Sequence, residues 1–569
     1  MSFSGAAGKA DRGAACAPTQ RGIAPVDGQW RHLPRRLGCF ALLSVVAMQA
    51  FAQSAPAKFR VSGKVVNVVN GHPLGGAEVW FGKAEDFEET QQKLLTGDDG
   101  VFVFTATDRG KYLLNAQANG FRRQGFEQHG IYSSATVVGA GLNTENIVFR
   151  LRPDGRVTGV VEDDDHEPVG GATIYLFRRD ASFGLSQTSL VTQTVSDDRG
   201  HYRFAHLEPG YYYVAVSASP WFSRVLQQAE AAGNSALSQK PEFDIAYPIT
   251  FYPGVTDVAA ASQIALNEGE DVTADFTLSP VPALRVRVDQ ALADQGRPMN
   301  VALQQKIFDT KIDQTSLRQV PVEDAIEIRG VAPGRYALQL VSVGESSVRA
   351  QRSTLLTLTD DAEVDPENAP PATPIRGVVR MQAGQKMTEQ AYVRLWNSRA
   401  GEVMDSTISD KGEISFASDF LTPGTYSVYA MNGPNSILSS LKATGAQVAG
   451  QTVQIAGGKP VELEIEMATV LSKITGTARR DKKTVAGAMI LLVPEDAENN
   501  LPKFRRDESD SDGTFTLVDV LPGRYRVLAI EDGWDLEWAN LSLLKKRLEH
   551  GQKIEVGPSK SYQAMVEVE

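Results

Sequence analysis

"VLPGRYRVLA", residues 520–529, contains a pattern that recurs along this chain of 569 residues. Related stretches are "LEPGYYYVAV" (207–216), "VAPGRYALQL" (331–340), "LTPGTYSVYA" (421–430) and a looser copy, "DRGKYLLNAQ" (108–117). Proline followed by glycine predicts a type II turn, in which the glycine takes a positive φ. After the turn, apolar side chains alternate with polar ones and begin with tyrosine, which is typical of a strand with one buried face. We therefore expect a repeated β domain whose core strand is headed by tyrosine.

Two other signals recur in step with this strand. A strand that contains a glycine opens most repeats, at 60–67, 156–163, 374–381 and 473–480. An acidic turn with a glycine precedes a further strand, at 97–104, 196–204, 409–416 and 509–517. The glycines of the Pro-Gly-Tyr motifs lie 100, 124, 90 and 99 residues apart, so each repeat has the size of a domain.

This spacing predicts a signal segment and five β-sandwich domains. The expected bounds are 1–52 for the signal peptide, then 58–151, 152–280, 283–366, 373–468 and 471–569. The third domain is degenerate, because it has lost the opening glycine and the glycine of the acidic turn. The second carries an aromatic-rich insertion that looks helical in its first part, and leucines near the C-terminus predict a short amphipathic helix.

The order G-x-V, G-A-x-V, D-x-G-x-[FY]-x-F and P-G-x-Y-x-[VL]-x-A resembles that of carboxypeptidase regulatory-like domains. These are related to collagen-adhesin B-type repeats and to transthyretin-like and starch-binding-like sandwiches. The resemblance covers nearly all of residues 58–569 and is weakest in the third repeat. It implies an all-β chain of tandem Greek-key β-sandwiches of the prealbumin/transthyretin type. Such domains are usually non-catalytic accessory or adhesive modules, and the resemblance implies no defined substrate.

The N-terminal segment is typical of an export signal. The basic stretch "RHLPRR" (31–36) ends an extended n-region and precedes the apolar run "LGCFALLSVVAMQAFA" (37–52). This run ends in an A-x-A cleavage site. We expect a mature chain that begins at Gln53, has no membrane span and is periplasmic, envelope-associated or secreted. Cys16 and Cys39 both precede this site, so the mature chain would hold its domains together without disulfides.

Charge and missing motifs exclude several function classes. The net charge of −12 becomes −16 without residues 1–52, which argues against nucleic-acid binding. None of the seven histidines lies in a zinc-peptidase motif, and no nucleophile elbow, Walker A loop or dinucleotide-binding fingerprint is present. We therefore predict a protein that is not an enzyme and uses no cofactor. An enzyme with an unrecognised site is the remaining alternative in this class.

Two groups of residues are candidate sites. Glu508, Asp510, Asp512 and Asp519 occupy positions similar to the ligands of an EF-hand calcium loop, but strands rather than helices are expected on both sides. An acidic hairpin turn, as at 98–100, is therefore the preferred interpretation, with calcium as a weak candidate. In the insertion, the aromatic side chains of Trp221, Tyr247, Phe251 and Tyr252 are candidates for stacking on a sugar. The alternative is that these rings pack the insertion against its own sandwich.

These observations favour a non-catalytic exported protein with a structural, spacer or adhesive role at the cell envelope. The alternative function is carbohydrate binding, so the expected partners are a carbohydrate or an envelope protein. Because each domain closes its own core, we expect a string of sandwiches with modest contacts between domains.

Overall fold

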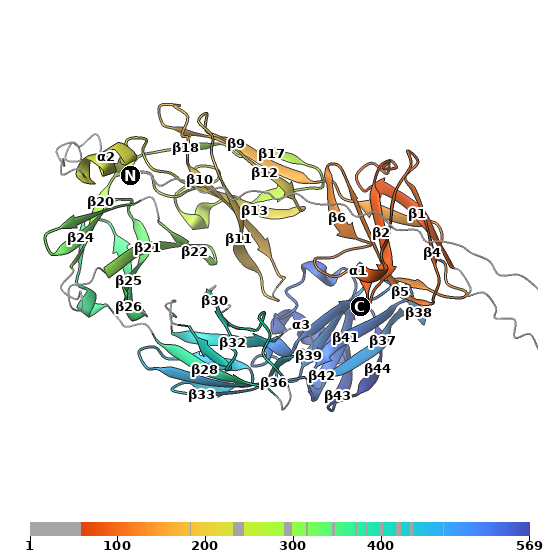
Figure 1. Ribbon diagram of the computed structural model, residues 1–569. Coiled ribbons are helices and arrows are strands. Elements are labelled where there is room, and N and C mark those ends of the chain that lie inside the picture. The colour runs from red at the N-terminus through yellow and green to blue at the C-terminus, as the bar shows by residue number, and fades with distance from the viewer. Residues whose placement is uncertain are drawn as a thin grey trace, which may run out of the picture. The chain divides into compact units, whose positions relative to one another are not determined.

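The structure is a computed structural model, and it is built almost entirely of β-strands (Figure 1). It describes residues 59–182, 184–231, 244–289, 299–314, 317–343, 348–369, 373–381, 385–397, 402–416, 421, 423–432, 436–469 and 471–569. The predicted signal peptide and the expected first residue of the mature chain, Gln53, lie outside the described residues. Residues 56–569 belong to one compact unit.

Buried apolar side chains form five successive cores, which define the five sandwiches named here. Their buried members span residues 61–151, 157–278, 286–369, 375–467 and 474–568. These five cores make the chain a series of tandem Greek-key β-sandwiches, as predicted. The degenerate third repeat also has its own core. The boundaries between the domains stay predictions.

The helices and strands of each sandwich follow in chain order. Sandwich 1 contains β1 Phe59–Asn67, β2 Glu78–Lys83, α1 Phe87–Thr90, β3 Gln92–Leu95, β4 Val101–Ala106, β5 Gly110–Ala118, β6 Phe121–Gly125, β7 Thr136–Val138 and β8 Ile147–Leu151. Sandwich 2 contains β9 Gly155–Asp163, β10 Thr173–Asp180, β11 Gln187–Val195, β12 His201–Leu207, β13 Gly210–Ser217, α2 Ser223–Ala231, β14 Ile245–Ala246, β15 Thr250–Phe251, η2 Val258–Ala260, β16 Ile264–Leu266, β17 Asp271–Thr273, β18 Phe276–Leu278 and β19 Val281–Pro282. Sandwich 3 contains β20 Leu284–Asp289, β21 Met299–Ile307, β22 Thr310–Asp313, β23 Arg318–Val322, β24 Ala325–Val331, β25 Gly334–Val343, β26 Val348–Leu358, β27 Ala362–Val364 and η4 Pro366–Asn368.

The fourth and fifth sandwiches complete the described chain. Sandwich 4 contains β28 Ile375–Arg380, β29 Tyr392–Asn397, β30 Glu402–Thr407, β31 Glu413–Ser415, β32 Gly424–Met431, β33 Ile437–Thr444, β34 Gln447–Ala449, β35 Thr452–Ile455 and β36 Val461–Ala468. Sandwich 5 contains β37 Ser472–Arg480, β38 Lys483–Thr484, β39 Met489–Pro494, η5 Leu501–Lys503, β40 Arg505–Glu508, β41 Thr514–Val520, β42 Gly523–Ile530, η6 Gly533–Asp535, α3 Leu541–His550, β43 Gln552–Val556 and β44 Ser561–Glu567.

All five sandwiches share one pattern of strand pairing. In one layer the opening strand pairs antiparallel with the strand after the acidic turn and parallel with a strand near the end of the repeat, as β1 does with β4 and β8. In the other layer the second strand pairs antiparallel with the tyrosine strand, as β2 does with β5 and β39 with β42. Sandwich 4 differs because β33 pairs with strands of both layers and joins them into one nine-stranded sheet.

The repeated tyrosine heads the core strand in every copy, as predicted. The five side chains are buried, and four of their hydroxyl groups donate a hydrogen bond to the carbonyl four residues earlier. In sandwich 5 this bond joins Tyr525 to Leu521 over 2.8 Å. Tyr426 instead donates to Glu402 Oε2 at 2.6 Å. The ring therefore fills the core, and in four sandwiches its hydroxyl group is hydrogen-bonded to the turn that precedes the strand.

The prediction of a type II turn at the Pro-Gly pair is wrong for Gly334, Gly424 and Gly523. These glycines are not among the residues with positive φ, and each is the first residue of its strand. A Cβ on Gly523 would lie 3.1 Å from the ring of Tyr525, two residues further along the same face. At Gly334 and Gly523 the tyrosine ring thus leaves little room for a side chain.

The two other recurring glycines also have steric causes. A Cβ on Gly63 of β1 or on Gly476 of β37 would collide with the carbonyl oxygen of the parallel neighbour strand. The glycines of the acidic turns have positive φ, for example 69° at Gly100 and 79° at Gly513, a conformation that side chains disfavour. These positions explain why three glycines recur in most repeats.

Candidate functional site

The aromatic residues of the insertion in sandwich 2 lie in different surroundings. The side chain of Trp221 is 83% exposed, and its ring centroid lies 5.7 Å from that of Phe222. Tyr247 and Tyr252 are partly buried against the core of sandwich 2. Phe251 is 3% exposed, so its ring is not available to stack on a ligand. The structure thus leaves Trp221 as the open ring among the four candidates.

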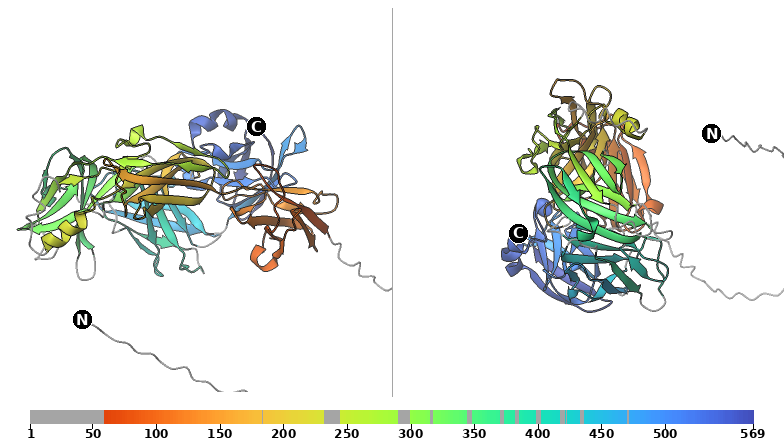
Figure 2. Two further views of the ribbon diagram at one scale, coloured as in Figure 1. Left: turned by 90° about the horizontal axis from the view of Figure 1, so that it is seen from above. Right: turned by 90° about the vertical axis from the view of Figure 1, so that its left-hand side faces the viewer.

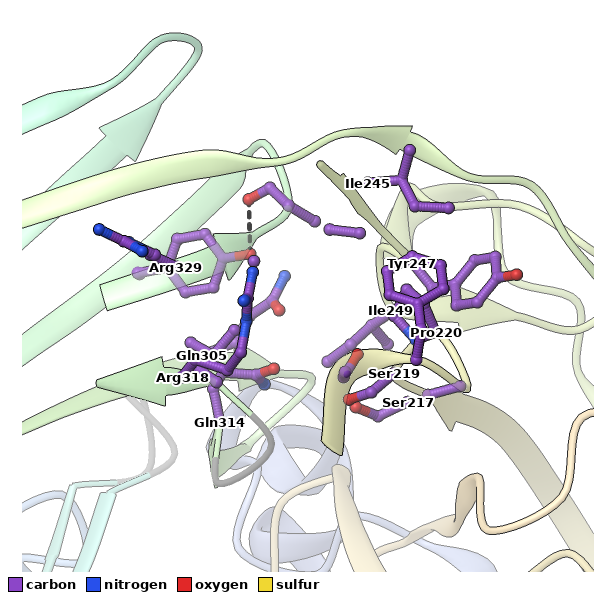
Figure 3. Close-up of a pocket in the computed structure, with 18 residues that line it drawn as sticks. Ser217, Ser219, Pro220, Ile245, Tyr247, Ile249, Gln305, Gln314, Arg318 and Arg329 are labelled. Carbon is purple, nitrogen blue, oxygen red and sulfur yellow. Dashed lines mark hydrogen bonds between the residues drawn. The ribbon is translucent and has the colours of Figure 1, made fainter. Parts of the chain in front are cut away.

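A cavity of about 30 Å³ separates this insertion from sandwich 3 (Figure 3). Ser217, Ser219 and Tyr247 line one side, and Gln314 and Arg318 are among the residues that face them from sandwich 3. Gln314 Nε2 is buried and makes no hydrogen bond to another described residue. A volume of this size holds water rather than a sugar ring.

Sandwich 3 inserts an aromatic side chain into sandwich 2 near the same place. The ring centroid of Phe308, in the turn between β21 and β22, lies 4.6 Å from that of Tyr213 and 5.2 Å from that of Phe177. The backbone of the next residue is also fixed, because Asp309 N donates to Thr188 O at 3.1 Å, and Thr188 N donates to Asp309 Oδ2 at 2.8 Å. The aromatic side chains of sandwich 2 on this side therefore form a contact between sandwiches.

The acidic segment of sandwich 5 forms a second contact, with sandwich 1. Ser134 Oγ donates to Glu508 Oε1 at 2.7 Å, and Ala135 N donates to Asp510 Oδ1 at 2.9 Å. Ser511 N donates to Ala135 O at 3.1 Å, and Val137 N donates to Ser511 Oγ at 2.9 Å. Asp510 also forms an ion pair with Lys111. We call the contact of residues 129–138 and Lys111 with residues 505–511 and Trp534 the first–fifth junction.

Aromatic and cationic groups extend the first–fifth junction. His129 Nδ1 lies 3.2 Å from Glu508 Oε2, and the imidazole stacks on the indole of Trp534 with a centroid distance of 4.9 Å. The guanidinium group of Arg506 lies 5.0 Å from the ring centre of Tyr132 and 4.5 Å from that of Trp538. These contacts combine hydrogen bonds, an ion pair and ring stacking in one interface.

Other hydrogen bonds join the sandwiches at further points. Arg506 Nη2 donates to Ser182 O in sandwich 2 at 3.2 Å, and Ala539 N donates to Gly184 O at 2.8 Å. Lys311 of sandwich 3 lies 2.9 Å from Glu402 of sandwich 4. Figure 2 shows the strands of the described residues from two further directions. Sandwiches that are far apart in the sequence, such as the first and the fifth, are therefore hydrogen-bonded. The expected string of sandwiches stays a prediction.

Burial shifts the proton affinities of the acidic segment. It raises the pKa of Asp507 to about 6, although the amide N–H groups of Thr516 and Glu508 donate to its carboxylate. Burial also raises the pKa of Glu508 against the opposing effect of His129 and Ser134, and it raises that of Asp510 against Lys111 and Ala135. Negative charge at the junction is therefore penalised, and the partners from sandwich 1 offset part of that penalty.

The structure does not bring the four calcium candidates together. Glu508 and Asp510 are buried against sandwich 1, whereas Asp512 Oδ1 accepts hydrogen bonds from the amide and hydroxyl groups of Thr514 in its own turn. Asp519 has φ of 56°, and its carbonyl accepts from Arg505 Nε at 3.0 Å. No group of three or more His, Cys, Asp or Glu side chains in the described residues is placed to hold a metal ion.

The hydrogen bond from Ala135 N to Asp510 can be tested separately from the turn that carries it. We expect Asp510→Ala to leave this buried N–H without an acceptor and to lower the free energy of unfolding by about 2 kcal/mol. Hydrogen exchange at the Ala135 amide should become at least about tenfold faster. Without the hydrogen bond to Asp510, the local opening that exposes this amide costs less free energy. Asp512→Ala is the matched control, since the Asp512 carboxylate accepts its hydrogen bonds from Thr514 in the same turn. Equal exchange at Ala135 in both variants would contradict the junction.

Comparison with known proteins identifies part of the chain. Residues 156–242 match the carboxypeptidase regulatory-like domain family. Sandwich 2 contains a carboxypeptidase regulatory-like domain. This regulatory-like domain carries Trp221 and the side chains that contact Phe308, so both lie in the matched region or beside it. For residues 156–242, the match confirms the resemblance that the repeated motifs indicated.

The comparison with solved structures gives matches of low sequence identity and low TM-score. The TIE protein of Bacillus anthracis is 11% identical, with 90% of this chain and 74% of that chain covered and a TM-score of 0.17. A minor pilin of Streptococcus agalactiae is 13% identical, with 39% and 97% covered and a TM-score of 0.20. The shaft pilin SpaA of Lactobacillus rhamnosus GG is 11% identical, with 40% and 98% covered and a TM-score of 0.19. Comparison with curated proteins gives no match.

Proposed function

We propose that this chain is a non-catalytic, exported protein of tandem β-sandwiches with a structural, spacer or adhesive role at the cell envelope. The observation that carries this proposal is where the unusual side chains lie. The carboxylates with raised pKa values and the stacked rings meet at the first–fifth junction, where Glu508 and Asp510 bond one sandwich to another. Groups engaged in this way hold domains together and are not presented to a substrate.

Two further observations support the proposal. The repeated core strand has a structural cause in every sandwich, so the repetition itself serves folding rather than catalysis. The described residues contain no helix long and apolar enough to cross a membrane. The export signal expected at residues 1–52 favours a protein that acts outside the cytoplasm.

Fractionation of cells that produce the full-length chain tests export. We expect the protein in the envelope fraction or the medium, with Gln53 as its first residue by N-terminal sequencing. A chain that stays in the cytoplasm and retains Cys39 would overturn the export proposal.

A panel of ester, glycoside, peptide and phosphate substrates tests the proposal that the protein is not an enzyme. Turnover that is lost when the protein is unfolded would show that the chain is an enzyme.

Carbohydrate binding at the insertion is the second candidate function. One observation favours it, which is that the indole of Trp221 is 83% exposed and free to stack on a pyranose ring. A glycan array with the wild-type chain and Trp221→Ala separates it from a purely structural role. Binding that Trp221→Ala abolishes would support this candidate, and an array without any signal would reject it.

A further inference from the structure

A second, larger cavity lies at the outer face of sandwich 4. Its volume is about 440 Å³, within the range of pockets that hold small ligands. Strands β29, β32, β35 and β34 lie side by side here and form one wall. The core-facing residues of these strands include Tyr426, Val428 and Val453, so the alternate side chains point outward.

The outward side chains of this wall form two rows across the strands. Thr425 pairs in register with Gln454, and Gln454 pairs with Gln447. In the next row Trp396 pairs with Ser427, and Ser427 pairs with Thr452. All of these residues line the cavity. The wall thus combines hydroxyl groups, amide groups and one indole.

Several of these polar groups are free to bind a ligand. Within the described part of the chain, the side chains of Thr425, Ser427, Gln447 and Gln454 make no hydrogen bond to protein. Thr452 differs, since its hydroxyl group donates to Ala449 O at 2.8 Å. Hydroxyl and amide groups can both donate and accept hydrogen bonds, so they match the hydroxyl groups of a ligand in either sense.

The opposite wall comes from other sandwiches and is largely apolar, with Glu498 and Asn499 of sandwich 5 as its polar residues. Ala497, Leu501, Ala539 and Leu541 of sandwich 5 line it, together with Leu185 of sandwich 2. The two walls are joined by a hydrogen bond from Gln451 N to Asn499 O at 2.8 Å, and within the opposite wall Ala539 N of sandwich 5 donates to Gly184 O of sandwich 2 at 2.8 Å. The cavity is therefore formed before a ligand arrives, which lowers the entropic cost of binding.

The chemistry of the two walls defines the class of ligand. A sugar ring has an apolar face and a rim of hydroxyl groups, so it fits between an apolar wall and a wall of amides and hydroxyl groups. Among the described residues Glu498 is the one charged residue that lines the cavity, and its carboxylate disfavours an anionic sugar. We propose that this cavity, between sandwiches 4 and 5, binds a neutral saccharide of one or two rings. The site is separate from the insertion that carries Trp221 and goes beyond the structural role.

Saturation-transfer NMR with maltose, cellobiose, lactose and chitobiose tests the proposal on the full-length chain. At about 10 mM sugar we expect transfer to at least one of the four, because even a millimolar complex is then populated. Gln454→Ala and Thr425→Val should each raise the dissociation constant about tenfold by removing one hydrogen bond. Both side chains are exposed, so these substitutions should leave the unfolding midpoint of the protein unchanged.

Trp221→Ala is the matched control and should bind the same sugar as the wild type. No transfer from any of the four sugars would overturn the proposal and would indicate a cavity filled with water. Binding that Trp221→Ala abolishes but Gln454→Ala and Thr425→Val leave intact would also overturn it, because the sugar would then bind at the insertion. Neither result bears on the structural role, which export and turnover measurements test separately.

Discussion

Tyr525→Ala should lower the free energy of unfolding of sandwich 5 by about 3–5 kcal/mol, as for other buried aromatic side chains. The ring of Tyr525 is part of a core that also contains Val527, Phe515 and Val556, and its removal leaves a cavity there. The hydroxyl group is a smaller part of the effect. Tyr525→Phe keeps the ring, loses the bond to Leu521 O, and should cost about 1 kcal/mol.

The free energy of unfolding of both variants is measured in denaturant, with hydrogen exchange of the β42 amides as the signal for sandwich 5. Tyr211→Ala serves as the control, because the side chain of Tyr211 is 56% exposed on a tyrosine strand of sandwich 2. It should change stability by less than about 0.5 kcal/mol, as is usual at the surface. A loss below about 1 kcal/mol for Tyr525→Ala would mean that the ring does not lie in the core.

Asp507→Asn should make the stability of sandwich 5 less dependent on pH. Burial raises the pKa of Asp507 to about 6, whereas the unfolded chain holds this proton with the ordinary affinity of an aspartate, near pH 4. Its contribution to stability is therefore fully present below about pH 4 and is lost as the pH rises through about 6. The folded and unfolded pKa values of Asp507 differ by about two units. Between about pH 4 and pH 7.5 the free energy of unfolding of the wild type should therefore fall by up to about 3 kcal/mol more than that of the variant.

The measurement is the free energy of unfolding at about pH 4.5, 6 and 7.5 for both chains. The difference between them isolates Asp507 from Glu508 and Asp510, whose pKa values are also raised. The groups around Asp507 are the amides of Thr516 and Glu508, the Asp510 carboxylate and the Lys111 ammonium group. Asp512→Asn removes one charge from the same segment and should keep the wild-type pH dependence. Parallel curves for Asp507→Asn and the wild type would show that Asp507 is hydrated.

The sequence alone predicted the elements and the cores because both depend on local patterns. Alternation of side chains identifies the tyrosine strands, and the regular spacing of glycines shows that each repeat closes one sandwich. The sequence did not show why a glycine stands at the start of the tyrosine strand. Gly523 is needed for the space taken by the ring of Tyr525, and the sequence suggested a positive φ instead.

The sequence predicted only in part whether the aromatic side chains of the insertion are buried or exposed. The sequence left packing and sugar binding open, since both use the same residue types. The structure separates them by burial, with Trp221 exposed and Phe251 enclosed beneath Phe308 of another sandwich. No local pattern links Phe308 to these rings, because the contact joins two folded surfaces.

The first–fifth junction depended entirely on tertiary structure. Three sandwiches can be compared at the position five residues before the glycine of the acidic turn, which holds Leu95, Val195 and Glu508. In each sandwich this position lies in the strand that pairs with the second strand. Leu95 is 67% exposed and Val195 is 58% exposed, whereas Glu508 is 1% exposed. An acid at this position was visible in the sequence, but its burial was not. Burial there requires sandwich 1 to cover sandwich 5 with Ser134 and His129, which lie more than 370 residues earlier in the chain. Periodicity determines which side of a strand faces its own core, while the contact between two finished surfaces depends on shape and charge that arise only after each sandwich has folded.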